Sequence, residues 1–539
     1  MRYALALTAA ALLAPASAFA ADPPITFQTH PFERVLGDLR AAADLIGGEQ
    51  AVKGFNDSIK EKFGPKGFEG LDLSKPIVGY VTLDPKPENI TAVIAFPVTG
   101  EKEFLALCDR ANGEKYKDLG KGLYQLPPLD PQYKARMRFA AGHAYIAYGA
   151  NPEPALEAKA LVAPEKLYDP SERGTIAGRF HFDRVPPEVK KSALTMLADL
   201  RKKLASEIDP SAPNQAAVKA AFAEIEKLTA RYLILLEQGA DTATVRVGLD
   251  PATADVFVDA TLTPKPGTQL AKEIAARKPA ENHFAGLFTP DTVAGFRYSA
   301  PLFAPEVRNA LAAFSGEQQK DLMNTLPEAA KATVEELMKG QARTMKSGEF
   351  DFALVVRGPD KNGLYTAVGA MSFDDPSGLE KAFKKYMEAD GPPEGVGAFK
   401  WDADKAGKVG IHTFKFNGGN VPPPVKMFGE DTTLAFAFAP KGIYVAFGPD
   451  PIAAVKDALK AKPAESAALD VLVNPARLAK MVEKGGGNPL AVERAIGKED
   501  KLLSAGSLRV ISGKELTVRF AVNLKIGPRA IFESTVRRD

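Results

Sequence analysis

The stretch YIAYGANP at residues 145–152 recurs near the other end of the chain as YVAFGPDP at residues 444–451. In each copy an apolar run ends at a glycine, which is followed within two residues by Asn or Asp and then by proline. An Asn or Asp side chain caps the first turn of a helix, and proline suits that turn because its φ is already fixed. Each copy therefore predicts a strand that ends at the glycine and an alanine-rich helix that begins after it.

Two further sets of segments recur in the same order along the chain. TVRV at 244–247 resembles SLRV at 507–510, and each is followed by a turn and a second alternating strand. The third match is between two strands and a following helix in each half, at 77–83, 90–98 and from 101, and at 350–357, 365–373 and from 376. Three matches in one order indicate an internal duplication.

Apolar residues alternate with period two in these strands, which is typical of antiparallel sheets with one buried face. Helical patterns interrupt the strands, and the two longest, at 187–237 and 305–345, do not occupy corresponding places in the two halves. We predict an α+β fold formed by tandem duplication of a domain whose antiparallel sheets are covered by helix pairs. The predicted domains are residues 21–283 and 284–539.

The first 20 residues have the order of a secretory signal peptide. Arg2 precedes an apolar run at 4–14, and Ala18-Phe19-Ala20 has the small-x-small form that signal peptidase requires. The run of about 11 residues is shorter than the roughly 20 needed to span a bilayer. We therefore predict a signal peptide at 1–20, cleavage after Ala20, and a soluble protein of the periplasm or cell exterior.

The composition excludes several classes of function. The 69 Lys and Arg residues nearly balance the 67 Asp and Glu residues, so no nucleic-acid partner is predicted. No later stretch is long and apolar enough for a transmembrane segment. Cys108 is the only cysteine, which excludes an internal disulfide. It follows Phe104 by four residues, which predicts that both lie on one buried helix face.

The chain shows no sequence-local motif for catalysis, metal binding or nucleotide binding. It contains no HExxH pattern, P-loop, Gly-x-Ser-x-Gly elbow or EF-hand loop. We therefore predict no catalytic, cofactor-binding or metal-ligating residue, and no cofactor. The histidines are scattered and are interpreted as packing residues: His30, His143, His181, His283 and His412.

Some single residues carry more specific expectations. His143 is expected in a hairpin turn, and His412 is expected half-buried beside aromatic rings, on one strand face with Phe414 and Phe416. Trp401, the only tryptophan, is expected to be half-buried rather than exposed for ligand stacking. Two pairs of adjacent acids, Asp374-Asp375 and Glu499-Asp500, are not expected to act in acid/base catalysis because adjacent side chains point apart.

The patterns favour a non-catalytic binding or scaffold protein whose partner is a small molecule, an envelope component or another protein. Proline- and glycine-rich loops at 126–131 and 418–424 fall in corresponding parts of the two halves, where binding residues are often found. An exported hydrolase with a scattered site is the first alternative, and His143 would be its first residue to test. A lipid-binding envelope protein is the second alternative.

Overall fold

The computed structural model describes residues 22–127, 132–206, 215–299, 308–309, 323, 326–348, 350–390, 396–416, 423–429 and 433–526. The predicted signal peptide at 1–20 lies outside these residues, as do 128–131 and 418–422 of the two predicted loops. Within the described residues the fold is α+β, and the strands in the main sheet of each unit pair antiparallel.

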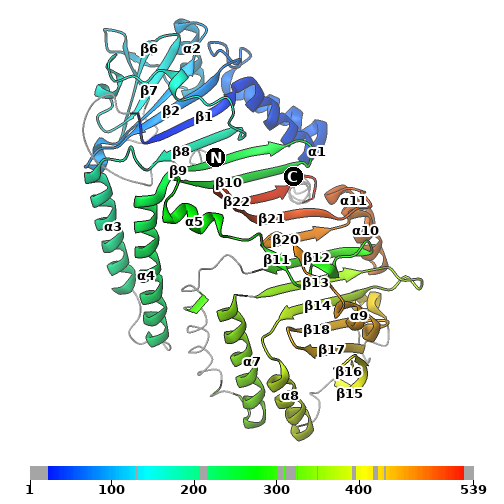
Figure 1. Ribbon diagram of the computed structural model, residues 1–539. Coiled ribbons are helices and arrows are strands. Elements are labelled where there is room, and N and C mark those ends of the chain that lie inside the picture. Colours follow the sequence, from blue (N-terminus) through cyan, green and yellow to red (C-terminus); the bar gives the residue numbers. More distant parts are fainter. Residues whose placement is uncertain are drawn as a thin grey trace. The chain divides into compact units, whose positions relative to one another are not determined.

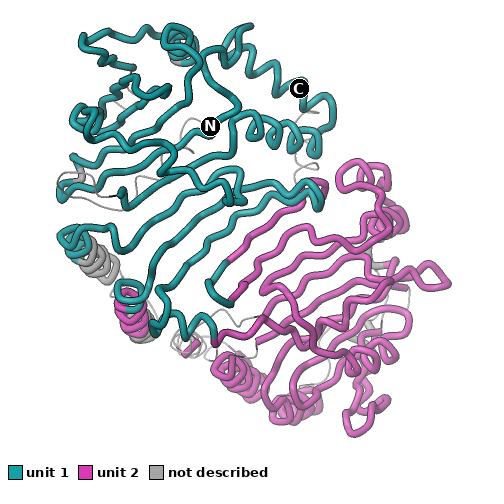
Figure 2. Tube along the Cα trace, turned by 45° about the horizontal axis from the view of Figure 1, so that its top comes forward, with its two compact units in different colours: residues 1–206, 235–275, 513–517 teal, residues 207–234, 276–512, 518–539 magenta. Residues whose placement is uncertain are grey.

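The chain divides into two compact units (Figure 2). Unit 1 contains residues 1–206, 235–275 and 513–517, and unit 2 contains residues 207–234, 276–512 and 518–539. The main division at 275/276 precedes the domain boundary expected at 283/284.

Unit 1 is built on a long antiparallel sheet (Figure 1). Its strands are β1 (Ile25–Pro31), β2 (Pro76–Thr82), β3 (Thr91–Pro97), β4 (Lys117–Asp118), β5 (Leu123–Leu126), β6 (Lys134–Ala140), β7 (His143–Gly149), β8 (Ile176–His181), β9 (Ala240–Asp250) and β10 (Asp255–Pro264). They pair in the order β4–β5–β6–β7–β3–β2–β1–β8–β9–β10. Its helices are α1 (Phe32–Phe63), α2 (Glu101–Asn112), α3 (Pro187–Ser206), α5 (Gln269–Ala275), and the short 3₁₀ helices η1 (Pro87–Asn89), η2 (Glu153–Leu156) and η3 (Pro164–Lys166).

Both faces of the β2–β7 part of this sheet are covered. On one face Tyr80, Val93 and Ala147 lie opposite one another on neighbouring strands and pack with Leu156 of η2. On the other face α2 packs against Met137 and Ala144, among other residues. Strand alternation places successive side chains in these two cores, as the burial pattern of β3 shows.

Unit 2 has the same kinds of elements. Its strands are β11 (Glu281–Asn282), β12 (Thr292–Ser299), β13 (Asp351–Arg357), β14 (Thr366–Ser372), β15 (Val396–Ala406), β16 (Val409–Phe416), β17 (Thr433–Ala439), β18 (Gly442–Gly448), β19 (Ala464–Glu465), β20 (Leu469–Val473) and β21 (Leu503–Ile511). Its helices are α7 (Glu328–Ser347), α8 (Ser377–Asp390), α9 (Pro451–Ala458), α10 (Pro475–Lys484), α11 (Pro489–Ile496), and the 3₁₀ helices η4 (Ala285–Leu287) and η5 (Pro423–Phe428). The helix α4 (Gln215–Gly239) and the strand β22 (Leu516–Asn523) each contain residues of both units.

The main sheet of unit 2 pairs in the order β15–β16–β17–β18–β14–β13–β12–β20–β21. Its largest core lies where α9 and η4 cover one face. There Val355, Val368 and Ala446 from neighbouring strands contact Phe284 and Val455. The helices α7 and α8 pack on each other, and so do α10 and α11.

The pairing orders of the two units correspond strand by strand from β4 to β9 and from β15 to β21. The recurring segments at 145–149 and 444–448 lie on β7 and β18, which hold the same place in the two orders. The other recurring segments lie on β2 and β13, on β3 and β14, and on β9 and β21. The strands predicted from the repeats are therefore confirmed in both units.

One helix predicted from the repeat does not form. In unit 2, Asp450 caps α9 as predicted, because its side chain accepts a hydrogen bond from the N–H of Ala453. In unit 1, the segment after Asn151-Pro152 is only the 3₁₀ turn η2. A second proline, Pro154, has no N–H to donate and restricts the residue before it, which works against a regular α-helix.

Helices also occur at corresponding places in the two units, although their lengths differ. The predicted helical pattern at 187–237 forms α3 and α4, between β8 and β9, and α10 and α11 lie between β20 and β21. The described part of the pattern at 305–345 includes α7, between β12 and β13, and α1 lies between β1 and β2. The two longest helical patterns therefore occupy different places in the two units, as expected, and each has other helices at its corresponding place in the other unit.

Candidate functional site

Unit 1 leaves a row of apolar side chains exposed on one face of β8, β9 and β10. Ile176 lies opposite Val247, and Val247 lies opposite Val258. These residues and Val245 form the apolar strip of unit 1, with exposed fractions of 36% for Ile176, 46% for Val245, 40% for Val247 and 38% for Val258. All four lie on one face, because Ile176 and Val258 are directly opposite Val247 and because Val245 is two residues from Val247 on β9.

The same sheet face is covered at the other end of β8. There Phe180 packs in a cluster with Val81 of β2, with Val185 just before α3, and with Val189 in the first turn of α3. The strip therefore begins where this cover ends.

Unit 2 also has an apolar strip on its sheet, and one of its three strands, β20, corresponds to β8 of unit 1. Phe296 on β12 lies opposite Leu354 on β13 and opposite Val471 on β20. Leu354 is 44% exposed and Val471 is 42% exposed. We call Phe296, Leu354 and Val471 the apolar strip of unit 2. β12 and β20 hold the places in the pairing order of unit 2 that β1 and β8 hold in unit 1.

The opposite face of β8 and β9 is polar and is organised around Glu172. The Glu172 side chain is only 2% exposed. Its Oε1 accepts a hydrogen bond from Nε of Arg246 at 2.5 Å, and its Oε2 accepts one from Nη2 of Arg179 at 3.4 Å. Arg246 also donates to the Thr261 hydroxyl at 2.8 Å. One buried carboxylate thus fixes two arginines from neighbouring strands.

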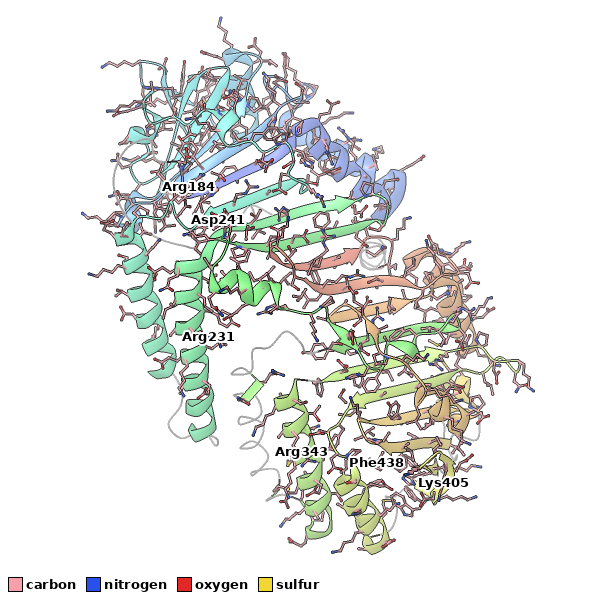
Figure 3. The ribbon with its side chains drawn as sticks, in the orientation of Figure 1. Arg184, Arg231, Asp241, Arg343, Lys405 and Phe438 are labelled. Atoms are coloured by element: carbon pink, nitrogen blue, oxygen red, sulfur yellow. The ribbon has the colours of Figure 1, made fainter. Side chains whose placement is uncertain are left out.

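A polar hollow of about 410 Å³ lies beside these arginines. Figure 3 labels two of its lining residues, Arg184 and Asp241. Burial, together with Arg184 and Arg179, lowers the pKa of His181 in its wall. The three arginines in the lining are matched by three acids, so the hollow does not select a ligand of one charge. The acids and the remaining lining residues are Asp183, Asp241, Glu515, Thr242, Thr244 and Thr263.

A second notable cluster surrounds His412 in unit 2. The His412 side chain is 0% exposed. Its ring packs 4.8 Å from Trp401 and 5.2 Å from Phe436, measured between ring centroids. The strand and the face predicted for His412 are confirmed, but it is fully buried rather than half-buried, because α8 and β15 also pack over it. Trp401 is half-buried, as expected.

The other singled-out residues have structural contacts. His143 is not in the turn itself but is buried as the first residue of β7, with Nδ1 3.0 Å from the carbonyl oxygen of Ala141. His30 is buried, with Nε2 3.1 Å from the carbonyl oxygen of Glu172. The His283 N–H donates to Asp351. These contacts bring none of the three together into one site.

Cys108 occupies the position expected from the sequence. It is buried on α2, in one cluster with Phe104. Burial raises the pKa of its thiol to about 12, so the reactive thiolate is scarce near neutral pH. This environment suits a packing residue.

The two acid pairs also have structural roles. Asp375 accepts hydrogen bonds from the backbone N–H and the hydroxyl of Ser377 at the start of α8, which lowers its pKa. Asp500 accepts a hydrogen bond from the Asn474 amide and lies 3.5 Å from Nε of Arg477. Neither pair is positioned as two facing carboxylates.

Sequence reasoning missed both apolar strips and the Glu172 cluster. The alternation of apolar residues identified the strands and assigned one face of each to the core. It did not show at which residues the segments that pack over this face come to an end. The Glu172 contact joins residues 74 positions apart in the chain. One feature of the sequence could have indicated the Glu172 cluster: Arg246 lies between two valines in an alternating strand, where a charged side chain needs a partner.

Within the described residues, no group of three or more His, Cys, Asp and Glu side chains is arranged to hold a metal ion. The described helices also include none with the length and apolar character needed to cross a membrane. Comparison with protein-family models, curated proteins and solved structures gives no match.

Proposed function

We propose that this protein is a non-catalytic binding or scaffold protein, and that the apolar strips of units 1 and 2 are its docking surfaces. The observation that supports this proposal most is that each unit exposes a row of apolar side chains on its sheet, and that the two rows share the place held by β8 in unit 1 and by β20 in unit 2. Neighbouring exposed apolar side chains are a common feature of interaction surfaces. Their recurrence in two units favours a shared role over incidental exposure.

The partner that best fits these strips is a protein with an apolar surface of its own. Each strip is a row of side chains standing on strands rather than a hollow that encloses a small molecule. The polar hollow of unit 1 has charged walls, which suit neither an acyl chain nor another apolar ligand. A packed protein surface can bury such a row while its polar rim stays hydrated. Lipid binding is the alternative, and the photocrosslinking experiment distinguishes it by the chemical nature of the adduct.

The two units are proposed to derive from tandem duplication of one domain. Three recurring sequence segments and the common pairing order of β4–β9 and β15–β21 support this history. Helices at corresponding places support it further. Duplication would supply two docking surfaces on one chain, and two linked sites bind a two-site partner more tightly than either does alone.

Export is proposed from the order of residues 1–20. Cells that express the full gene are expected to yield an exported protein whose intact mass starts at Ala21, because signal peptidase cleaves after Ala18-Phe19-Ala20. Intact-mass spectrometry of the periplasmic and culture fractions checks this. Replacing Ala18 and Ala20 by Gln should block cleavage. An uncleaved chain confined to the cytoplasm would contradict export.

Photocrosslinking tests the docking proposal. We place a benzophenone amino acid at Val245 in one variant and at Leu354 in another, within cells that express the protein. Each position should give a discrete protein adduct, because a bound partner would lie against both strips. Leu490 is the matched control, because it is an apolar residue on α11 that is 53% exposed and belongs to neither strip.

A second variant links the adduct to the apolar character of the strip. Val247→Asp introduces a charge beside Val245 on the same face of β9. A partner packed closely against the strip would have to remove the water from this charge, which is unfavourable. The adduct at Val245 should then be lost, while circular dichroism stays unchanged. The docking proposal is rejected if no adduct forms or if Leu490 gives the same adducts. A lipid adduct would support the lipid-binding alternative instead.

A further inference from the structure

The contacts of His412 assign its proton. The backbone N–H of Asp402 donates a hydrogen bond to Nδ1 of His412 at 3.0 Å. Nδ1 must therefore be an acceptor, which makes the ring neutral and places its proton on Nε2. Nε2 lies 3.4 Å from Oε1 of Glu380 on α8.

This bond replaces part of the sheet ladder. β15 is an end strand of the pairing order, and its pairing with β16 is irregular between Lys400 and Asp404. Within that irregular part Asp402 has a φ of 48°, which is uncommon for a residue other than glycine. The His412 ring thus accepts a hydrogen bond from the N–H of Asp402, a bulged residue that is not paired in the register of β15 with β16.

Adding a proton to His412 is incompatible with this arrangement. An imidazolium has a proton on both nitrogens and cannot accept the Asp402 N–H. The extra charge would also be fully buried among Trp401, Phe436 and Phe438. These aromatic rings offer neither an acceptor nor water.

The charged groups around His412 act in opposite directions. Glu380 favours the protonated ring, whereas Lys384 disfavours it and lies 2.7 Å from Glu380. The carboxylate of Asp402 lies 3.7 Å from Lys384 and also favours protonation. Burial is the largest influence, and the pKa of His412 falls below its ordinary 6.5. Because the unfolded chain takes up this proton first, stability is lost as the pH falls below 6.5.

We propose that His412 is an acid-sensitive latch, which holds the bulge of β15 against β16 while neutral and releases the segment around Trp401 when protonated. The latch is separate from the proposed docking strips, and its test does not depend on a partner.

The single tryptophan makes the latch measurable. Trp401 lies edge-on to the His412 ring, and an imidazolium quenches a neighbouring indole far more than neutral imidazole does. Tryptophan emission of the purified protein should therefore change as the pH is lowered, with its midpoint below 6.5, because protonation and release both alter the surroundings of Trp401. His412→Asn keeps an acceptor near the position of Nδ1 and does not titrate, so this variant should lose the transition. His412→Phe removes the acceptor and should free the segment at every pH.

Two neighbouring variants test the electrostatic environment. Glu380→Gln removes the carboxylate that favours the imidazolium, so the midpoint should shift to lower pH. Lys384→Gln removes the cation that disfavours it, so the midpoint should shift to higher pH. His181→Asn, in unit 1, should leave the emission curve unchanged. Shifts in the opposite directions would overturn the assignment of His412 as the titrating group.

Hydrogen exchange then separates protonation from release. At one acidic pH the peptide covering 396–406 should exchange faster in the wild type than in His412→Asn, and a peptide from β6 and β7 should not differ. If His412→Asn retains the wild-type emission transition, His412 is not the sensor. If the transition depends on His412 but exchange is unchanged, the ring titrates without opening and the latch is rejected.

Discussion

Glu172→Gln should destabilise unit 1 by about 3 kcal/mol, the lower end of the range for breaking a buried ion pair. The substitution preserves shape but leaves Arg246 and Arg179 without the carboxylate that they share. Both arginines are partly exposed, so water recovers some of the lost interaction. Arg179 also keeps its pair with Asp169, which limits the loss further.

Denaturant unfolding followed by circular dichroism measures this effect. Glu157→Gln is the matched control, because Glu157 belongs to unit 1 and pairs with Lys159 while both side chains remain exposed. Removing that exposed pair should change stability by at most about 1 kcal/mol. Equal effects of the two substitutions would show that the Glu172 cluster contributes no more than a surface ion pair.

Phe284→Ala should destabilise unit 2 by about 3–5 kcal/mol, the range found for removing a buried phenylalanine. Phe284 is 1% exposed and lies in the largest core of unit 2. Its ring meets Tyr444 of β18 edge to face, with centroids 5.6 Å apart. Alanine would leave a cavity between η4 and the sheet, which the surrounding strands can close only in part.

The emission of Trp401 reports this change, because the only tryptophan lies in unit 2. Phe520→Ala is the control, since Phe520 also belongs to unit 2 but is 49% exposed. Its removal should cost about 1 kcal/mol or less, as at most surface positions. A Phe284 variant no less stable than the Phe520 variant would contradict the assigned core.

The sequence by itself determined the elements that depend on local patterns. Period-two alternation located β7 and β18, and the Asp450-Pro451 pair located the start of α9. The four-residue spacing of Phe104 and Cys108 placed both on the buried side of α2. Such features follow from the backbone periods of strands and helices, so a few neighbouring residues suffice to reveal them.

The prediction of a helix after β7 was wrong because a second proline follows the helix-start signal. Asn151-Pro152 has the same start signal as Asp450-Pro451, but Pro154 follows and only the turn η2 forms. The proposed duplication therefore preserved the strand while the element after it diverged. Reading the start signal together with the following residues would have found this difference.

Tertiary structure alone decided the candidate surfaces and the polar contacts. Ile176, Val247 and Val258 have the alternation of core residues, yet they remain exposed because the packing around Phe180 ends before it reaches them. His412 is fully buried because α8 and β15, which lie elsewhere in the sequence, pack over its strand. Alternation fixes which side of a strand a residue faces, but the cover over that side comes from distant segments, and only their packing determines whether the face becomes core or surface.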